Sequence, residues 1–282
     1  MFLQWLINLW LRVTGRTISL EQFPRLKGPV SDENVVGVDY YRRFADRNDL
    51  NTEISQRNGL LPDFSVVLDP RFAHTHKLNR KVRDFYEHTA SYKLEVWSQW
   101  FTFISFFARI LITSVSKRMN QLNIPLNPLE TSRGMSSDII SLTDKTTGDV
   151  RFTCWLRKLV KSGRVVYAGF YTSCYIEKFN RNFVKVVFPL PKGNVTVILR
   201  VDVQPDGSVK LISAGKKIGD PGYYRVVQVS DDRIKARYIP IHESIHVYED
   251  EEHILRTDHI FYFWRIKFLH LHYKILEIPK EK

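Results

Sequence analysis

Residues 194–213 read NVTVILRVDVQPDGSVKLIS, and this stretch decides the fold class of the chain. Apolar residues alternate with other residues on both sides of Pro205-Asp206-Gly207. Two alternating runs joined by such a turn are the sequence pattern of a β-hairpin. We therefore expect a strand over residues 194–203, a tight turn, and a second strand over residues 208–213.

The same period of two continues on both sides of this hairpin. Short segments rich in turn-forming residues separate the runs, and none is long enough for the crossover connection that parallel strands need. The sequence therefore predicts a large curved antiparallel β-sheet or barrel of about ten strands for residues 126–282. The further strands are expected at residues 138–143, 150–156, 164–176, 183–189, 223–229, 234–239, 242–248, 254–264 and 268–278.

Residues 1–125 show a helical pattern instead. Helices are expected around residues 39–47, from about Leu78 onward, and over residues 97–115. The last of these is about long enough to cross a bilayer, but Arg109 lies in its middle, which favours a buried helix in a soluble fold. The chain is accordingly assigned to the α+β class, with a helical N-terminal region packed on the β-domain. A single integrated domain is the alternative.

The chain is basic, with 42 Lys+Arg against 30 Asp+Glu and a formal net charge of +12. The excess is spread along it: residues 1–125 hold 17 basic and 12 acidic side chains, and residues 126–282 hold 25 and 18. Nucleic-acid binding needs cations gathered on one face, and the sequence has neither a zinc-finger spacing nor an RRM motif. These observations argue against a nucleic-acid partner, whereas a diffuse positive field also suits an anionic membrane surface.

Residues 1–14 predict a short, strongly apolar helix that contains Trp5 and Trp10. The segment has no preceding cation and no small-x-small cleavage site, so it does not resemble a signal peptide. It is also too short to span a bilayer. It would either pack on the protein or on a second subunit, or dock on an anionic membrane surface. With only 2 Cys, the chain is expected in the cytoplasm, with membrane association and oligomerisation left open.

The sequence lacks the common catalytic motifs: G-x-S-x-G, the P-loop, G-x-G-x-x-G and H-E-x-x-H. No cofactor is therefore predicted. Histidines gather near the C-terminus, where His270 and His272 share one face of an expected strand. Such a pair can bind zinc or iron when a third ligand converges, but no spacing selects one from carboxylates such as Glu243. We assign no metal and keep His270 and His272 as the candidate ligands.

Two expected strands each carry an Arg-x-Asp pair, Arg200 with Asp202 and Arg256 with Asp258. In a strand the members of each pair share one face, while His259 lies on the opposite face from Asp258. A pair that points inward needs further hydrogen bonds or a ligand, because burying an ion pair is costly. A pair that points outward only makes the sheet surface polar. The sequence leaves both orientations open.

The aromatic content of 13% favours a ligand cavity within the curved sheet. The leading hypothesis is a binding or carrier protein for a hydrophobic or amphiphilic small molecule. The alternative is an enzyme of the cyclase, isomerase or decarboxylase type, in which Asp258 and His259 transfer protons. A third class is a peripheral membrane or protein-interaction module. The expected ligand-binding residues are Tyr171, Arg200, Asp202, Glu243, Arg256 and Trp264.

Overall fold

The computed structural model describes residues 13–31, 33, 35–71, 77–101, 116, 119–123, 134–230 and 232–279. Fourteen strands of these residues form one sheet. Each strand expected from residue 138 onward is confirmed, with small shifts at the ends. The strands are β1 (Arg16–Ser19), β2 (Leu50–Ile54), β3 (Tyr92–Trp100), β4 (Met135–Asp144), β5 (Val150–Leu159), β6 (Val165–Ile176), β7 (Arg181–Leu190), β8 (Gly193–Val203), β9 (Val209–Ile212), β10 (Tyr223–Gln228), β11 (Arg233–Ile239), β12 (Ile241–Glu249), β13 (Leu255–Phe263) and β14 (Ile266–Glu277).

Neighbouring strands pair antiparallel throughout, in the order β2-β4-β5-β6-β7-β8-β9-β12-β13-β14-β3. Strand β8 joins two parts of this sheet. Its first half pairs with β7 and β10, and residues 200–203 pair with β9. Strands β10, β11 and β1 form a branch that starts at β8. The hairpin expected around residues 205–207 is confirmed as the connection between β8 and β9.

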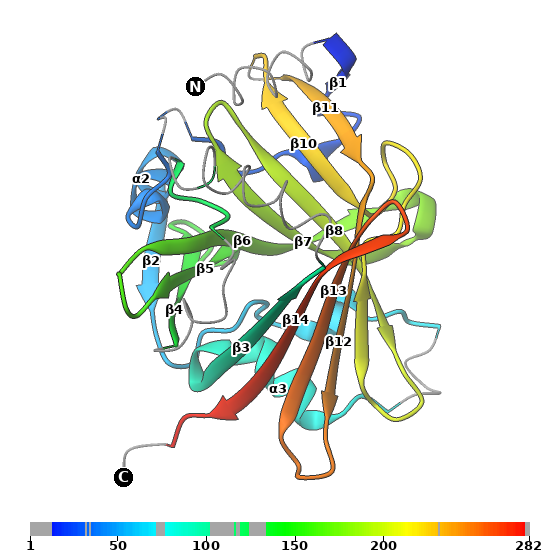
Figure 1. Cartoon of the computed structure of the whole chain (residues 1–282). Coiled ribbons are helices and arrows are strands. Elements are labelled where there is room, and N and C mark those ends of the chain that lie inside the picture. Colours follow the sequence, from blue (N-terminus) through cyan, green and yellow to red (C-terminus); the bar gives the residue numbers. More distant parts are fainter. Residues whose placement is uncertain are drawn as a thin grey trace.

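The sheet curls so that strands far apart in its order come together (Figure 1). Arg157 of β5 lies over the ring of Tyr273 of β14, with 5.8 Å between its guanidinium carbon and the ring centroid. The sheet is not closed, because no strand pairing among the described residues joins the terminal strands β2 and β3. The curved antiparallel sheet is confirmed, and the closed barrel is not.

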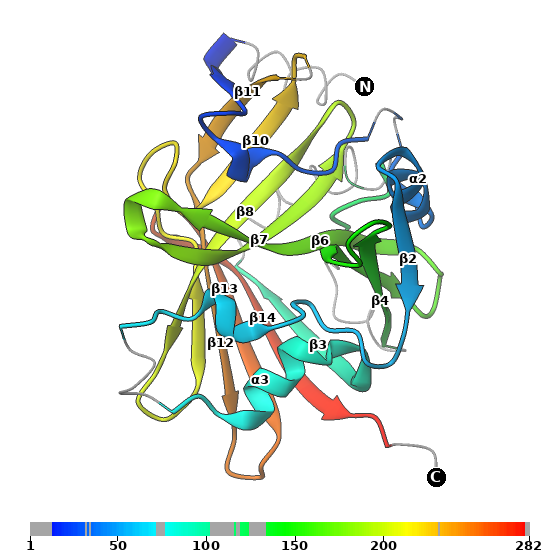
Figure 2. The same ribbon diagram turned by 180° about the vertical axis from the view of Figure 1, so that it is seen from behind.

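Helix α3 (Arg80–Glu87) lies across the strands β12, β13, β14 and β3 and is in front of them in Figure 2. The side chain of Asn79 caps this helix by accepting hydrogen bonds from its first backbone N–H groups. The 3₁₀-helix η2 (Phe64–Val67) packs beside it, with 4.3 Å between the stacked rings of Phe64 and Tyr86. Together they cover one side of the curved sheet.

Helix α2 (Tyr40–Arg47) confirms the helix expected at residues 39–47 and packs on another part of the sheet. The ring of Phe44 meets Phe170 edge-on, at 5.4 Å between centroids. No helix of the described residues is both long enough and apolar enough to cross a membrane. The remaining short 3₁₀-helices are η1 (Pro24–Leu26), η3 (Thr89–Ser91) and η6 (Glu177–Phe179).

The helical N-terminal region expected for residues 1–125 is not confirmed, because β1, β2 and β3 come from it. Residues 97–100 of the helix expected over 97–115 belong to β3, which pairs with β14 along its length. In β3, Tyr92 and Leu94 are buried while Lys93 between them is exposed, which is the alternation of a strand rather than of a helix. Residues 1–12 and 102–115, which carry the other predictions for this region, lie outside the described residues.

The sheet buries apolar side chains on both faces, and β8 shows how its residues divide between them. Leu199 belongs to a core cluster that also contains Phe85 and Tyr86 of α3. Ile198 points the other way and packs with Tyr224 in a separate cluster. Odd-numbered residues of β8 therefore face the interior of the curl, and even-numbered residues face away from it.

Candidate functional site

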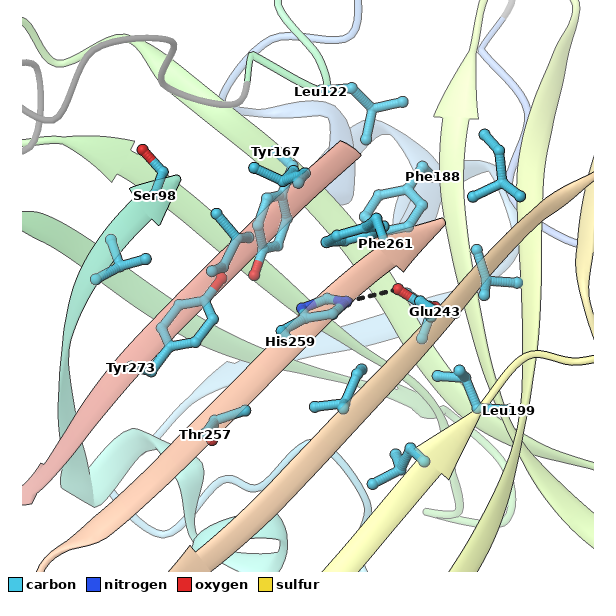
Figure 3. A pocket seen from close by; sticks show the side chains of 18 of the residues that line it. Ser98, Leu122, Tyr167, Phe188, Leu199, Glu243, Thr257, His259, Phe261 and Tyr273 are labelled. Atoms are coloured by element: carbon cyan, nitrogen blue, oxygen red, sulfur yellow. Dashed lines mark hydrogen bonds and ion pairs between the residues drawn. The ribbon is translucent and has the colours of Figure 1, made fainter. Parts of the chain in front are cut away.

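A cavity of about 850 Å³ lies inside the curl of the sheet. Side chains from β3 to β10 and from β12 to β14 line it, together with residues of α3 (Figure 3). Most of these side chains are aliphatic or aromatic. Its rim includes Trp264, which is 65% exposed and lies in the turn between β13 and β14. The volume lies within the range of known small-molecule sites.

Alternation along β13 decides which polar side chains enter this cavity. Thr257, His259 and Phe261 line the cavity, whereas Arg256 and Asp258 point to the opposite face. The sequence left the orientation of the Arg256–Asp258 pair open, and in the structure the pair points outward. His259 is therefore part of the cavity wall, and the carboxylate of Asp258 is not.

Glu243 of β12 and His259 of β13 form a pair inside the cavity (Figure 3). The Nε2 atom of His259 lies 2.7 Å from the Oε2 atom of Glu243. The imidazole also stacks on Phe261, with 4.1 Å between ring centroids. The pair therefore presents a carboxylate and an imidazole, held by hydrogen bonding and stacking, to a largely apolar space.

Arg157 of β5 lies at the wall of the same cavity and is fully buried, with 0% of its surface exposed. Its guanidinium lies over the ring of Trp155 at 5.3 Å and over that of Tyr273 at 5.8 Å. Within the described part of the chain, none of its three guanidinium nitrogens has a partner at hydrogen-bond geometry. This residue is a buried cation whose charge no carboxylate of the described residues balances within salt-bridge distance.

Four tyrosines surround these polar groups: Tyr167 and Tyr171 of β6, Tyr223 of β10 and Tyr273 of β14. Burial raises the pKa of all four hydroxyls, so they stay protonated and can donate hydrogen bonds. The positive charge of Arg157 opposes this rise in the pKa of Tyr167, which lies directly opposite it on the neighbouring strand. In Figure 3 the hydroxyls of Tyr167 and Tyr273 point toward each other.

The residues expected from sequence divide between the cavity and the outer face of the sheet. Tyr171, Glu243, His259 and Trp264 line the cavity. Arg200 does not, because it follows Leu199 on β8 and points outward, where it binds Asp202 with 2.8 Å between Nη2 and Oδ2. Arg256 and Asp258 are likewise absent from the lining.

Arg256 and Asp258 each have partners on the outer face. The Nε atom of Arg256 lies 2.7 Å from an oxygen of Asp250. The Oδ1 atom of Asp258 lies 2.9 Å from Nε2 of His270 and 3.0 Å from Nδ1 of His272. Burial raises the pKa of Asp258, but hydrogen bonds from His272 and His270 outweigh it and the net pKa is lowered.

His270 and His272 therefore both contact the carboxylate of Asp258. They are not arranged around a point where a metal ion could take a third ligand. The described part of the chain contains no group of three or more His, Cys, Asp or Glu residues that could hold a metal ion. The outer-face cluster of Asp258, His270 and His272 has the geometry of a structural hydrogen-bond network.

Sequence reasoning missed Arg157, Tyr223 and Tyr273. The signal for Arg157 was present, because it alternates with Trp155 and Leu159 in a strand whose inward residues are large and apolar. The next residue, Lys158, obscures this signal, because two adjacent cations are typical of a solvent-exposed segment. The inward position of Arg157 follows only from the curl of the sheet.

The chain is similar to the uncharacterized membrane protein YndJ of Bacillus subtilis (strain 168), with 27% identity over 226 residues. The match covers 78% of this chain and 38% of that protein, so the chain spans about two fifths of the length of its curated relative. No protein-family model matches the chain, and no solved structure matches it. The cavity is therefore the feature from which a function can be inferred.

Proposed function

We propose that the chain binds an amphiphilic small molecule in the cavity of the curved sheet. The observation that carries this proposal is an apolar and aromatic space of about 850 Å³ that contains a few polar groups. Ligand sites of proteins share this composition, in which apolar walls supply affinity and a few polar groups set orientation. Each methylene group that leaves water contributes about 0.8 kcal/mol, so a hydrocarbon chain gains most from such a wall.

Two further observations support an amphiphile over a purely apolar ligand. The cavity contains Arg157, Glu243, His259 and several tyrosine hydroxyls, which a hydrocarbon would leave without partners. In addition, the Bacillus relative carries the name of a membrane protein, and membranes are the main source of amphiphiles in a cell. Membrane association of this chain through residues 1–14 stays a prediction.

The proposal is tested by native mass spectrometry of the full chain purified without detergent. We expect a bound species of defined mass, released when the protein is unfolded and recovered by organic extraction. A second arm titrates the stripped protein with dodecanoate and 1-dodecanol. A preparation that carries no adduct and binds neither probe would show that the proposal is wrong.

The Glu243–His259 pair supports a second candidate function, an acid–base enzyme of the isomerase type. The separation of 2.7 Å allows the carboxylate to hold the imidazole in one orientation, as general acid–base catalysis requires. In this candidate Glu243 replaces Asp258, which points away from the cavity.

Deuterium exchange separates the two candidates. The molecule recovered from the native protein is incubated in D₂O with the wild type and with His259→Gln. An enzyme that removes a proton from carbon adds deuterium to the molecule only with the wild type. Equal masses after both incubations indicate a carrier.

A further inference from the structure

Arg157 has an environment that is incomplete as the protein stands. Its side chain is fully buried, yet none of its guanidinium nitrogens has a hydrogen-bond partner among the residues that the structure describes. Buried charges are normally paired, because an isolated charge loses its hydration without compensation. A buried cation at the wall of a cavity therefore indicates that something in the cavity completes its environment.

Two aromatic neighbours of Arg157 cover the faces of its guanidinium, and the nearby hydroxyl of Tyr167 carries no charge to balance it. The ring centroids of Trp155 and Tyr273 lie at 5.3 and 5.8 Å from the guanidinium carbon, which is a cation–π arrangement. Ring faces do not accept the in-plane N–H bonds, of which a guanidinium has five. An acceptor that approaches in the guanidinium plane is still required.

The described residues of the protein supply no such acceptor with a negative charge. Among the described residues that line the cavity, Glu243 is the only carboxylate, and its Oε2 atom is engaged by His259 at 2.7 Å. The neighbouring groups are hydroxyls of Tyr167 and Tyr273, which burial keeps protonated. Cation and hydroxyl donors thus gather at one place in a largely apolar cavity.

We infer that Arg157 is the anchor for an oxyanion, and that the natural ligand is an anionic amphiphile with a carboxylate or phosphate head. A planar guanidinium binds either group through two parallel N–H···O bonds. The hydroxyls of Tyr167 and Tyr273 donate to the same head, and the hydrocarbon part lies along the apolar wall. This inference rests on the proposed function and names the chemical class of its ligand.

The test compares probes of one chain length that differ in the head group. Dodecanoate, dodecyl phosphate, 1-dodecanol and dodecyltrimethylammonium are titrated by calorimetry into the full chain, as wild type, Arg157→Met and Arg157→Lys. Methionine keeps the length of the side chain and removes the charge. Arg200→Met is the matched control, because it removes the same charge from the outer face, where Arg200 pairs with Asp202.

We expect the wild type to bind one or both anions about 10- to 100-fold more tightly than 1-dodecanol, the range of charged hydrogen bonds. Arg157→Met should lose this preference and keep its affinity for 1-dodecanol, Arg157→Lys should retain part of it, and Arg200→Met should behave as the wild type. The ratio between the two anions then tells a carboxylate ligand from a phosphate ligand.

Other outcomes separate this inference from the function on which it rests. Equal binding of all four probes by the wild type overturns the role of Arg157 and leaves the proposed function of the cavity intact. A preference for anions that Arg157→Met retains has the same meaning. Binding of no probe refutes both. If Arg157→Met does not fold, the affinities of the wild type and Arg157→Lys for the anionic, neutral and cationic probes still decide whether Arg157 binds an oxyanion.

Discussion

Replacement of Asp69 by Asn should lower the free energy of unfolding more than the loss of an exposed charge does, because Asp69 pairs with a buried arginine. Nη1 of Arg181 lies 2.8 Å from Oδ2 of Asp69, and the two side chains are 5% and 6% exposed. Arg181 also donates to the carbonyls of Val67, at the end of η2, and Val201 of β8. Asp69→Asn leaves this buried guanidinium without its counter-charge.

The structure sets the size of the effect. Hydrogen bonds from Arg71, together with the charge of Arg181, lower the pKa of Asp69 from 3.8 to about 2. A shift of this size corresponds to about 2 kcal/mol of stability at neutral pH. Loss of one partner from a buried pair typically costs about 3–5 kcal/mol. We therefore expect a loss of about 2–5 kcal/mol in the free energy of unfolding.

The assay is urea unfolding of the wild type and Asp69→Asn at a series of pH values. Because the folded-state pKa of Asp69 is lowered, its contribution is complete above about pH 4 and is lost as the pH falls toward 2. The two proteins should converge there. The control is Asp49→Asn, which removes the same charge from an exposed ion pair with Lys145 and should cost less than about 1 kcal/mol because Asp49 is 82% exposed. A gap below about 1 kcal/mol at pH 7, or one that persists at pH 2, refutes this reasoning.

Three further changes have defined outcomes. Burial lowers the pKa of Lys185 from 10.5 to about 8, so through this group the unfolded chain holds more protons between these values. In urea unfolding, the difference in stability between the wild type and Lys185→Met should therefore shift in favour of the wild type as the pH rises through this window. Asp258→Asn should cost about 1 kcal/mol by thermal unfolding, because it removes the negative charge of the group that His270 and His272 share, and should change dodecanoate affinity less than twofold. Burial raises the pKa of the Cys154 thiol, so iodoacetamide should label it only after unfolding, as followed by mass spectrometry.

The strands after residue 134 could be predicted from sequence because their signals are local. Alternation and turn residues such as Pro205 and Gly207 lie within each hairpin. The strands β1, β2 and β3 could not be predicted in this way, because their partners β11, β4 and β14 lie far along the chain. In β3 the nearby aromatic residues also imitate a buried helix.

The sequence predicts which residues of the candidate site share one face of a strand. It does not predict which face lines the cavity. Period two correctly placed Arg256 with Asp258 on one face of β13 and His259 on the other. Which face lines a cavity depends on the direction in which the sheet curls, and no single strand encodes that direction. For the same reason Arg157, rather than Arg200, places a buried cation at the cavity wall.

Filling the cavity from β8 tests the central claim most directly. Leu199 points into the cavity (Figure 3), and Ile198 packs on the opposite face against Tyr224. We measure dodecanoate binding and the free energy of unfolding for Leu199→Trp and for Ile198→Trp. If the cavity is the ligand site, Leu199→Trp stays as stable as the wild type and loses at least about tenfold in affinity, whereas Ile198→Trp loses about 1–3 kcal/mol of stability by overpacking. A Leu199→Trp variant that is destabilised like Ile198→Trp and still binds dodecanoate normally would contradict the account.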